Sequence, residues 1–150
     1  MAKSRNFGSA SVKLLCSLSL VLLAGCTSPS LTEPYRALLV QKERCFELAK
    51  SGSDVFPQSE WLSNLPNEEQ KVVLSYLSQY AYNQCINEQV RAVKQSVSQQ
   101  SKDIQTFFNE YVGLHEFNGE IPLGIEPEAL LIIQEQIQVP FVANDVYESL

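Results

Sequence analysis

A long stretch without helix-breaking residues constrains the fold of this chain more than any other feature. Between Asn67 and Val112 there is neither glycine nor proline, the two residues that most often end helices. Asn67 followed by Gln70 resembles a capping box at the start of the stretch, and Gly113 is a natural stop. The sequence therefore predicts an all-α fold, a small helical bundle with one long central helix.

A segment rich in serine and glutamine at residues 96–101 weakens this prediction locally. Serine side chains compete for backbone hydrogen bonds, so they favour helix ends over helix interiors. Ser101 can cap a fresh start. The stretch is therefore one helix, or two helices with a break near residues 98–101.

Shorter helices are expected on both sides of the long one. A first helix is expected over about residues 33–50, with Thr32 as its N-cap and Gly52 closing it. A short helix should open at Pro127, which suits a first helical turn. A last helical turn is expected from Asn144.

The first 25 residues have the three parts of an export signal. Lys3, Arg5 and Lys13 make the start positive, and an apolar run follows at residues 14–24. That run is too short to span a bilayer as a stable helix. Small residues then lead to Cys26.

The motif Leu23-Ala24-Gly25-Cys26 resembles the lipobox of bacterial lipoproteins. The resemblance implies that residues 1–25 are removed and that the cysteine becomes the lipidated N-terminus, carrying two or three acyl chains such as palmitate. Chains of that kind would anchor the protein in a membrane almost permanently. The alternative is an ordinary secretory signal followed by a chance cysteine.

The residues that follow Cys26 indicate where the domain is held. Thr27 stands where inner-membrane lipoproteins of Gram-negative bacteria tend to have aspartate, which implies an outer-membrane address. Residues 26–32 form a polar tether that reaches only about 20 Å when extended. The single helical domain of residues 33–150 is thus expected close to its membrane.

Removal of the signal leaves Cys45 and Cys85 as an isolated pair in an exported domain. Exported thiols meet oxidising conditions, so a Cys45–Cys85 disulfide is predicted. Redox pairs usually have two residues between their cysteines, and a zinc site needs more ligands than this chain offers. We therefore expect a structural bridge, no metal site and no cofactor.

An apolar stripe on the long helix indicates how the two cysteines would meet. Its members share one face of the helix: Leu74, Leu77, Ala81, Cys85 and Ala92. The small side chains of Ala81 and Ala92 are expected to let the first helix approach closely.

A second apolar stripe repeats every seven residues over residues 86–111, as in coiled coils. Its members are Val90, Val97, Ile104 and Tyr111, with Ile86, Val93 and Phe107 in the complementary positions. Packing against the chain's own helices is the favoured interpretation. A helix of another protein and a homodimer are the alternatives.

Two sets of apolar residues make up the expected partner surface. Val90, Val97, Ile104 and Phe107 come from the second stripe, and Leu131 and Ile132 come from an apolar run. The binding groove is expected between the long helix and residues 130–133. Burial of that run in the core is the alternative.

The charge balance excludes some partners. The sequence has 11 basic and 17 acidic residues, and all three basic residues of the signal leave with it. Eight basic against 17 acidic residues then give a net charge of −9. Such a body is unsuited to binding nucleic acid or anionic lipid. Membrane attachment would therefore depend on the lipid on Cys26.

The sequence carries no catalytic motif that stands out. The one histidine, His115, precedes Glu116 in a loop between glycines, without a marked nucleophile or second histidine. We expect it to be a solvated loop residue. Glu68 and Glu69 are explained by the helix dipole, since they fall in the first turn of the long helix.

These features predict a non-enzymatic lipoprotein of the outer membrane, facing the periplasm, that binds or helps assemble other envelope or secretion proteins. The small helical body, single bridge and short tether resemble the format of type II secretion pilotins, lipoproteins that escort a pore-forming partner to the outer membrane. No motif of that class matches residue by residue. The alternatives are a self-associating structural lipoprotein and an enzyme or inhibitor whose site forms only on folding.

Overall fold

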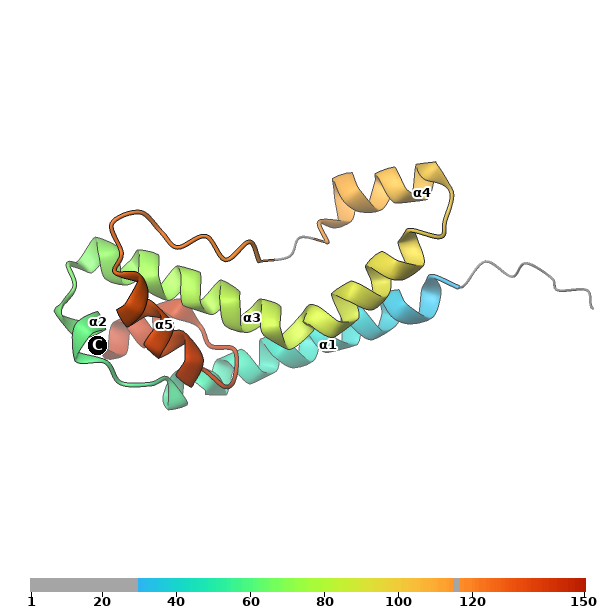
Figure 1. Ribbon diagram of the computed structural model, residues 1–150. Helices are drawn as coiled ribbons and strands as arrows, with labels where there is room; N and C mark the ends of the chain where they lie inside the picture. The colour runs from blue at the N-terminus through green and yellow to red at the C-terminus, as the bar shows by residue number, and fades with distance from the viewer. Residues whose placement is uncertain (1–29, 115–116) are drawn as a thin grey trace, which may run out of the picture.

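The computed structural model describes residues 30–114 and 117–150 (Figure 1). The predicted lipobox lies outside the described residues, as do His115 and Glu116. Within the two described ranges the chain is helical and has no strand, which confirms the all-α fold. In the same ranges, no helix combines the length and the apolar character needed to cross a membrane.

Eight helical segments make up the described chain. They are α1 (Thr32–Gly52), the 3₁₀ turn η1 (Ser53–Val55), α2 (Glu60–Asn64), α3 (Asn67–Val97), α4 (Lys102–Phe107), the π-helical turn η2 (Phe108–Val112), α5 (Pro127–Gln136) and α6 (Ala143–Ser149). At 1.5 Å per residue, the 31 residues of α3 span about 46 Å. The long central helix is therefore confirmed.

The long helix is interrupted where the serine-rich segment lies. α3 ends at Val97, and α4 begins after Ser101. The side chain of Ser101 makes no capping hydrogen bond. The corner is held by the Gln105 side chain instead, whose amide donates to the carbonyl oxygens of Ser98 at 3.2 Å and Gln100 at 2.9 Å.

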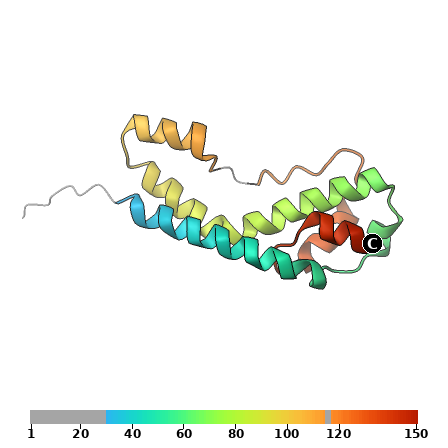
Figure 2. The same ribbon diagram turned by 180° about the vertical axis from the view of Figure 1, so that it is seen from behind.

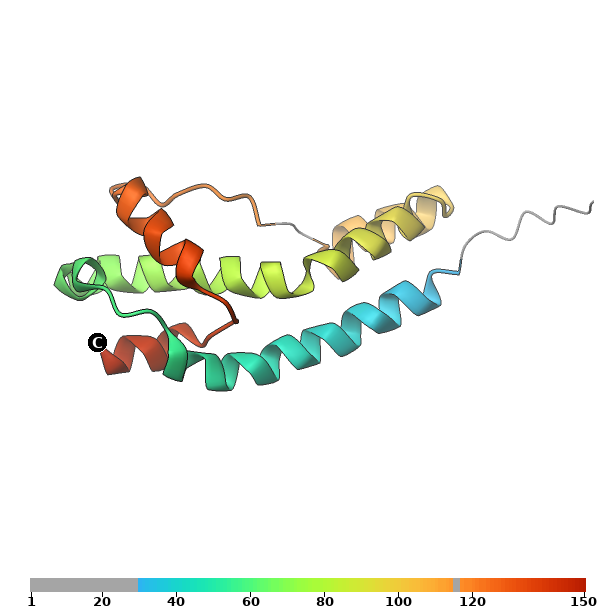
Figure 3. The ribbon, with the colours of Figure 1, turned by 60° about the horizontal axis from the view of Figure 1, so that its bottom comes forward.

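The helices form an elongated body with two different ends. α1 and α3 run antiparallel side by side, and α4 folds back at the end where the described chain begins (Figures 1 and 2). We call this the proximal end. α2, α5, α6 and the C-terminus lie around the other end, which we call the distal end (Figure 3).

Each end has its own hydrophobic core. The distal core buries side chains of α2, α3, α5 and α6 and neighbouring segments: Leu62, Val73, Leu74, Tyr76, Leu77, Ala81, Ile125, Leu130, Ile133, Phe141 and Val146. The proximal core buries side chains of α1, α3 and η2 and of one residue just beyond η2: Leu38, Cys45, Ile86, Val90, Val93, Val97, Phe108 and Leu114.

α3 presents different faces to the two cores. Ala81 is its last residue in the distal core and Ile86 its first in the proximal core. Five residues correspond to a rotation of about 140° around a helix. Ala92 lies on the same face of α3 as Ala81. In the proximal half this face is left uncovered, and the Ala92 side chain is exposed. The prediction that Ala92 lets α1 approach is wrong for this reason.

The predicted disulfide is confirmed. Cys45 of α1 is bonded to Cys85 of α3, with the two Cα atoms 6.1 Å apart. Cys45 is fully buried. The side-chain amide of Gln41, one turn earlier on α1, donates to the Cys85 carbonyl oxygen at 2.9 Å and lies 3.4 Å from the Cys45 sulfur. The bridge and this amide together fix α1 against α3.

The expected helix caps differ from the observed ones. Thr32 is the first residue of α1 and not its cap, and its backbone N–H bonds to Ser30 Oγ at 3.4 Å. Gln70 does not form a capping box with Asn67, because its side-chain amide donates to the Ser63 carbonyl oxygen at 3.1 Å. In both cases the observed hydrogen bond is made with a residue that precedes the helix, Ser30 or Ser63, and the capping motif in the sequence does not indicate it.

Gly52 ends α1, although not by a left-handed turn. Its φ is −69°, an ordinary helical value. A Cβ at this position would overlap the carbonyl oxygen of Pro140 in the segment between α5 and α6. Glycine is required here by the close approach of that segment, not by the backbone angle.

We predict that removing the bridge costs about 4 kcal/mol. Cys45→Ala combined with Cys85→Ala opens a loop defined by a sequence separation of 40 residues, for which the chain-entropy model gives that loss of unfolding free energy. Urea unfolding of the double variant and of the wild type measures it. Reduced wild-type protein is the control and should show a similar loss. A difference below about 1 kcal/mol would mean that the two cores hold α1 without the bridge.

Candidate functional site

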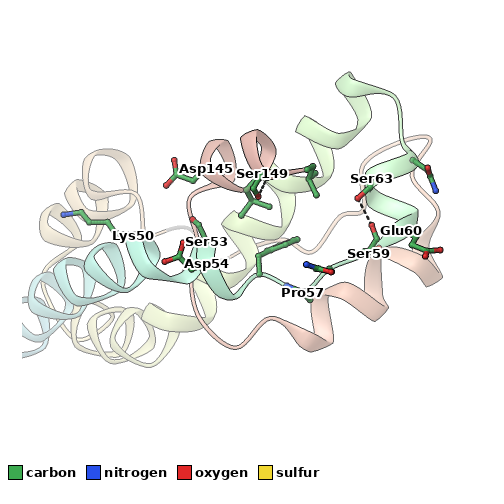
Figure 4. A pocket seen from close by; sticks show the side chains of 14 residues that line it. Lys50, Ser53, Asp54, Pro57, Ser59, Glu60, Ser63, Asp145 and Ser149 are labelled. Atoms are coloured by element: carbon green, nitrogen blue, oxygen red, sulfur yellow. Dashed lines mark hydrogen bonds between the residues drawn. The ribbon is translucent and has the colours of Figure 1, made fainter.

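An open pocket of about 780 Å³ lies at the distal end (Figure 4). Its wall is built by the end of α1, η1, α2, α6 and the segment between η1 and α2. The size is in the range of small-ligand and side-chain pockets. Its apolar lining comes from Phe56, Pro57, Val146 and Leu150.

Hydrogen bonds of serine side chains hold the elements of the pocket in place. Ser53 Oγ accepts from the backbone N–H of Val142 at 3.2 Å, which ties η1 to the start of α6. Ser59 caps α2 by accepting from Leu62 N–H at 3.3 Å. Ser63 Oγ donates to the Ser59 carbonyl oxygen at 3.1 Å (Figure 4). These hydroxyl groups therefore have structural partners.

The charged side chains of the pocket are mostly acidic. Asp54, Glu60 and Asp145 line it, and Lys50 is the one basic residue in the lining. Lys50 Nζ is paired with Glu47 Oε1 at 2.7 Å. No ion pair within the described part of the chain involves the three acidic residues. An arrangement of this kind suits a cationic group placed beside an apolar surface.

The predicted groove beside residues 130–133 is filled by the chain's own side chains. Leu130 is fully buried and Ile133 is 3% exposed in the distal core. Leu131 and Ile132 point outward, with 42% and 60% of their surface exposed. The run is therefore partly core and partly surface, since successive residues of a helix face different directions.

The repeating stripe is likewise divided between core and surface. Val90 and Val97 are buried in the proximal core, which confirms the favoured packing against the chain's own helices for this part of the stripe. Ile104 and Phe107 lie beyond the break, on α4, and are exposed. The expected partner surface is thus not continuous, because Val90 and Val97 are buried. Its exposed residues form two pairs at opposite ends of the body: Ile104 with Phe107, and Leu131 with Ile132.

Neither the pKa shifts nor a group of metal-binding side chains identifies a catalytic residue within the described ranges. Burial raises the pKa of Tyr76, with Tyr80 a smaller cause, and burial also raises the pKa of Tyr82. Both phenols therefore stay neutral to higher pH, and the Tyr76 hydroxyl donates to the Gly119 carbonyl oxygen at 3.4 Å. Residues 30–114 and 117–150 contain no group of three His, Cys, Asp or Glu side chains able to hold a metal ion.

The acidic pocket residues were not singled out from the sequence. Asp54, Glu60 and Asp145 are separated along the chain and belong to no motif. Only the docking of α6 onto η1 brings Asp145 into the lining of the same pocket as Asp54 and Glu60. Comparison with protein-family models, with curated proteins and with solved structures finds no match to this chain.

We predict that neighbouring isoleucines of α5 respond oppositely to truncation. Ile133→Ala should lower the unfolding free energy by about 2–4 kcal/mol, because it opens a cavity in the distal core. Ile132→Ala is the matched control and should change it by less than about 1 kcal/mol, since that side chain is mostly exposed. Denaturant unfolding of both variants checks this. Equal losses would contradict the described orientation of α5.

Proposed function

We propose that this protein is a bacterial outer-membrane lipoprotein, anchored through Cys26 and facing the periplasm, that binds another envelope protein and performs no reaction itself. The observation that carries the proposal is the lipobox-like motif ending at Cys26, combined with the position of the first described residues. The described chain starts at the proximal end of an elongated body (Figure 1). A lipid anchor attached there leaves the distal end free.

The length of α1 determines how far the distal end lies from the proposed lipid anchor. The 21 residues of α1 span about 32 Å, from the proximal end to the distal pocket. Ser30 lies four positions after Cys26 in the sequence, which adds at most about 14 Å. A partner at the distal end would be held a few tens of ångströms from the membrane surface. That distance suits an adaptor that contacts the periplasmic part of a membrane-bound protein.

The distal end offers two features to a protein partner. Leu131 and Ile132 expose apolar side chains on α5 without a role in the core. The pocket beside α2 and α6 adds carboxylates without ion pairs among the described residues. Apolar anchors flanked by charge are typical of specific protein interfaces. The partner would present an apolar surface and a basic side chain.

Photocrosslinking in intact cells tests this function. A photoreactive phenylalanine analogue at position 131 of the full chain should capture one envelope protein repeatedly. Ile132→Glu should reduce the capture about tenfold or more, because a charge replaces an apolar contact in the interface. Cys26→Ser should detach the chain from the membrane fraction and lower the amount of the captured protein in the outer membrane.

Val40→Glu is the matched control for that experiment. Val40 is also an exposed apolar residue, although it lies on α1. Its substitution should leave the capture unchanged. Equal loss with both variants, or capture of the chain only by itself, would contradict the adaptor function and favour a self-associating structural lipoprotein.

A further inference from the structure

An exposed apolar surface lies at the proximal end, and the core does not account for it. Phe107 and Tyr111 expose 53% and 75% of their surface, and Ile104 of the same helical face is also exposed. Leu39 on α1 is 49% exposed. We call these four residues the proximal patch. Exposed apolar side chains gathered in this way mark a surface that contacts something else.

Contacts between aromatic rings join the patch to α1. The ring of Tyr111 lies 5.6 Å from that of Phe107, and Phe107 lies 5.9 Å from Phe108. Phe108 in turn packs edge-on against Tyr35 of α1, with 5.6 Å between ring centroids. The rings thus form one continuous chain from the start of α1 to the end of η2.

An apolar groove of about 380 Å³ adjoins these rings. It is lined by Leu31, Thr32, Tyr35, Arg36, Leu39 and Phe108. Leu31 is the residue just before α1, so the groove opens where the chain enters the described body. Four of these six residues have large apolar or aromatic side chains, so the groove is suited to hydrocarbon.

Only some of the apolar side chains at the proximal end belong to its hydrophobic core. Phe108 and Leu114 complete the proximal core. Phe107 and Tyr111, four residues apart, share the opposite, outward face of the α4–η2 segment. Phe107 contacts the Phe108 ring of that core, but more than half of the surface of both Phe107 and Tyr111 stays exposed, which indicates a role outside the chain.

The position of Cys26 identifies the occupant. At most about 14 Å of extended chain separates Cys26 from Ser30, and Ser30 directly precedes the groove residue Leu31. The acyl chains expected on Cys26 therefore enter the bilayer beside the patch. Phenylalanine, leucine and tyrosine are the side chains that interfacial proteins place at the boundary between head groups and acyl chains.

We infer that the proximal patch rests on the lipid surface of the membrane, so that the proximal end of the body is held there. This inference rests on the proposed anchoring through Cys26. Contact through apolar and aromatic side chains does not require anionic lipid, which agrees with the acidic composition of the chain. The membrane contact also fixes the tilt of a body that a flexible tether alone would leave free.

Depth measurement with a fluorescent label tests the inference. The full chain with Phe107→Cys is produced in a bacterium, isolated from its membranes, reconstituted into phosphatidylcholine vesicles and labelled with an environment-sensitive fluorophore. Nitroxide-bearing lipid should quench most of the fluorescence, and aqueous iodide should quench little of it. The same result is expected for Tyr111→Cys, which guards against a local effect of either substitution.

Val55→Cys is the matched control. Val55 is an apolar residue with 68% exposure at the distal end. Its label should respond to iodide and not to the nitroxide lipid. Equal responses of the two positions would overturn the lipid contact of the proximal patch, and protection of position 107 from both quenchers would overturn it in favour of a protein contact. Unlabelled wild-type chain that fails to float with the vesicles would instead contradict the anchoring through Cys26.

Discussion

The bridge between Cys45 and Cys85 holds α1 against α3 at the level where the core of the molecule changes sides. Ala81 still belongs to the distal core and Ile86 already belongs to the proximal one, with Cys85 between them. Because α3 turns different faces to the two cores, neither core alone fixes the register of α1 along the whole of α3. The proximal core is small, and Cys45 is itself one of its eight buried residues. The covalent link therefore stabilises the end of the molecule where hydrophobic burial is least.

The two ends differ in ways that suit two different contacts. The proximal end combines the entry of the chain, an apolar groove and exposed aromatic rings. The distal end combines an acidic pocket with outward apolar residues of α5. A rigid pair of antiparallel helices separates them by about 30 Å. In the account proposed here the first end meets lipid and the second end meets protein, so the helix pair acts as a spacer of fixed length.

The helical framework could be predicted from the sequence, because its determinants are local. The stretch without glycine or proline predicted a long helix, the serines marked a break near residues 98–101 as one of two alternatives, and the isolated cysteine pair predicted the bridge. The surfaces could not be predicted in the same way. A seven-residue repeat groups Val97 with Ile104 on one face, but it does not indicate that the chain turns between them and leaves only Ile104 exposed. Nor does it show what covers a face, which is why Ala92 was misplaced and why the sequence left Val90 open between the core and a partner surface. The pocket carboxylates come from separate elements, so no spacing along the chain relates Asp54 to Asp145.

The central claim is that Cys26 carries the lipid by which the rest of the molecule is oriented. Mass spectrometry of the intact chain, isolated from bacterial membranes, tests it most directly. The account predicts a mature protein that begins at Cys26 and is heavier than its amino-acid sequence by a diacylglyceryl group, with or without a further acyl chain. A chain that retains residues 1–25, or one that begins elsewhere with a free Cys26 thiol, would contradict it.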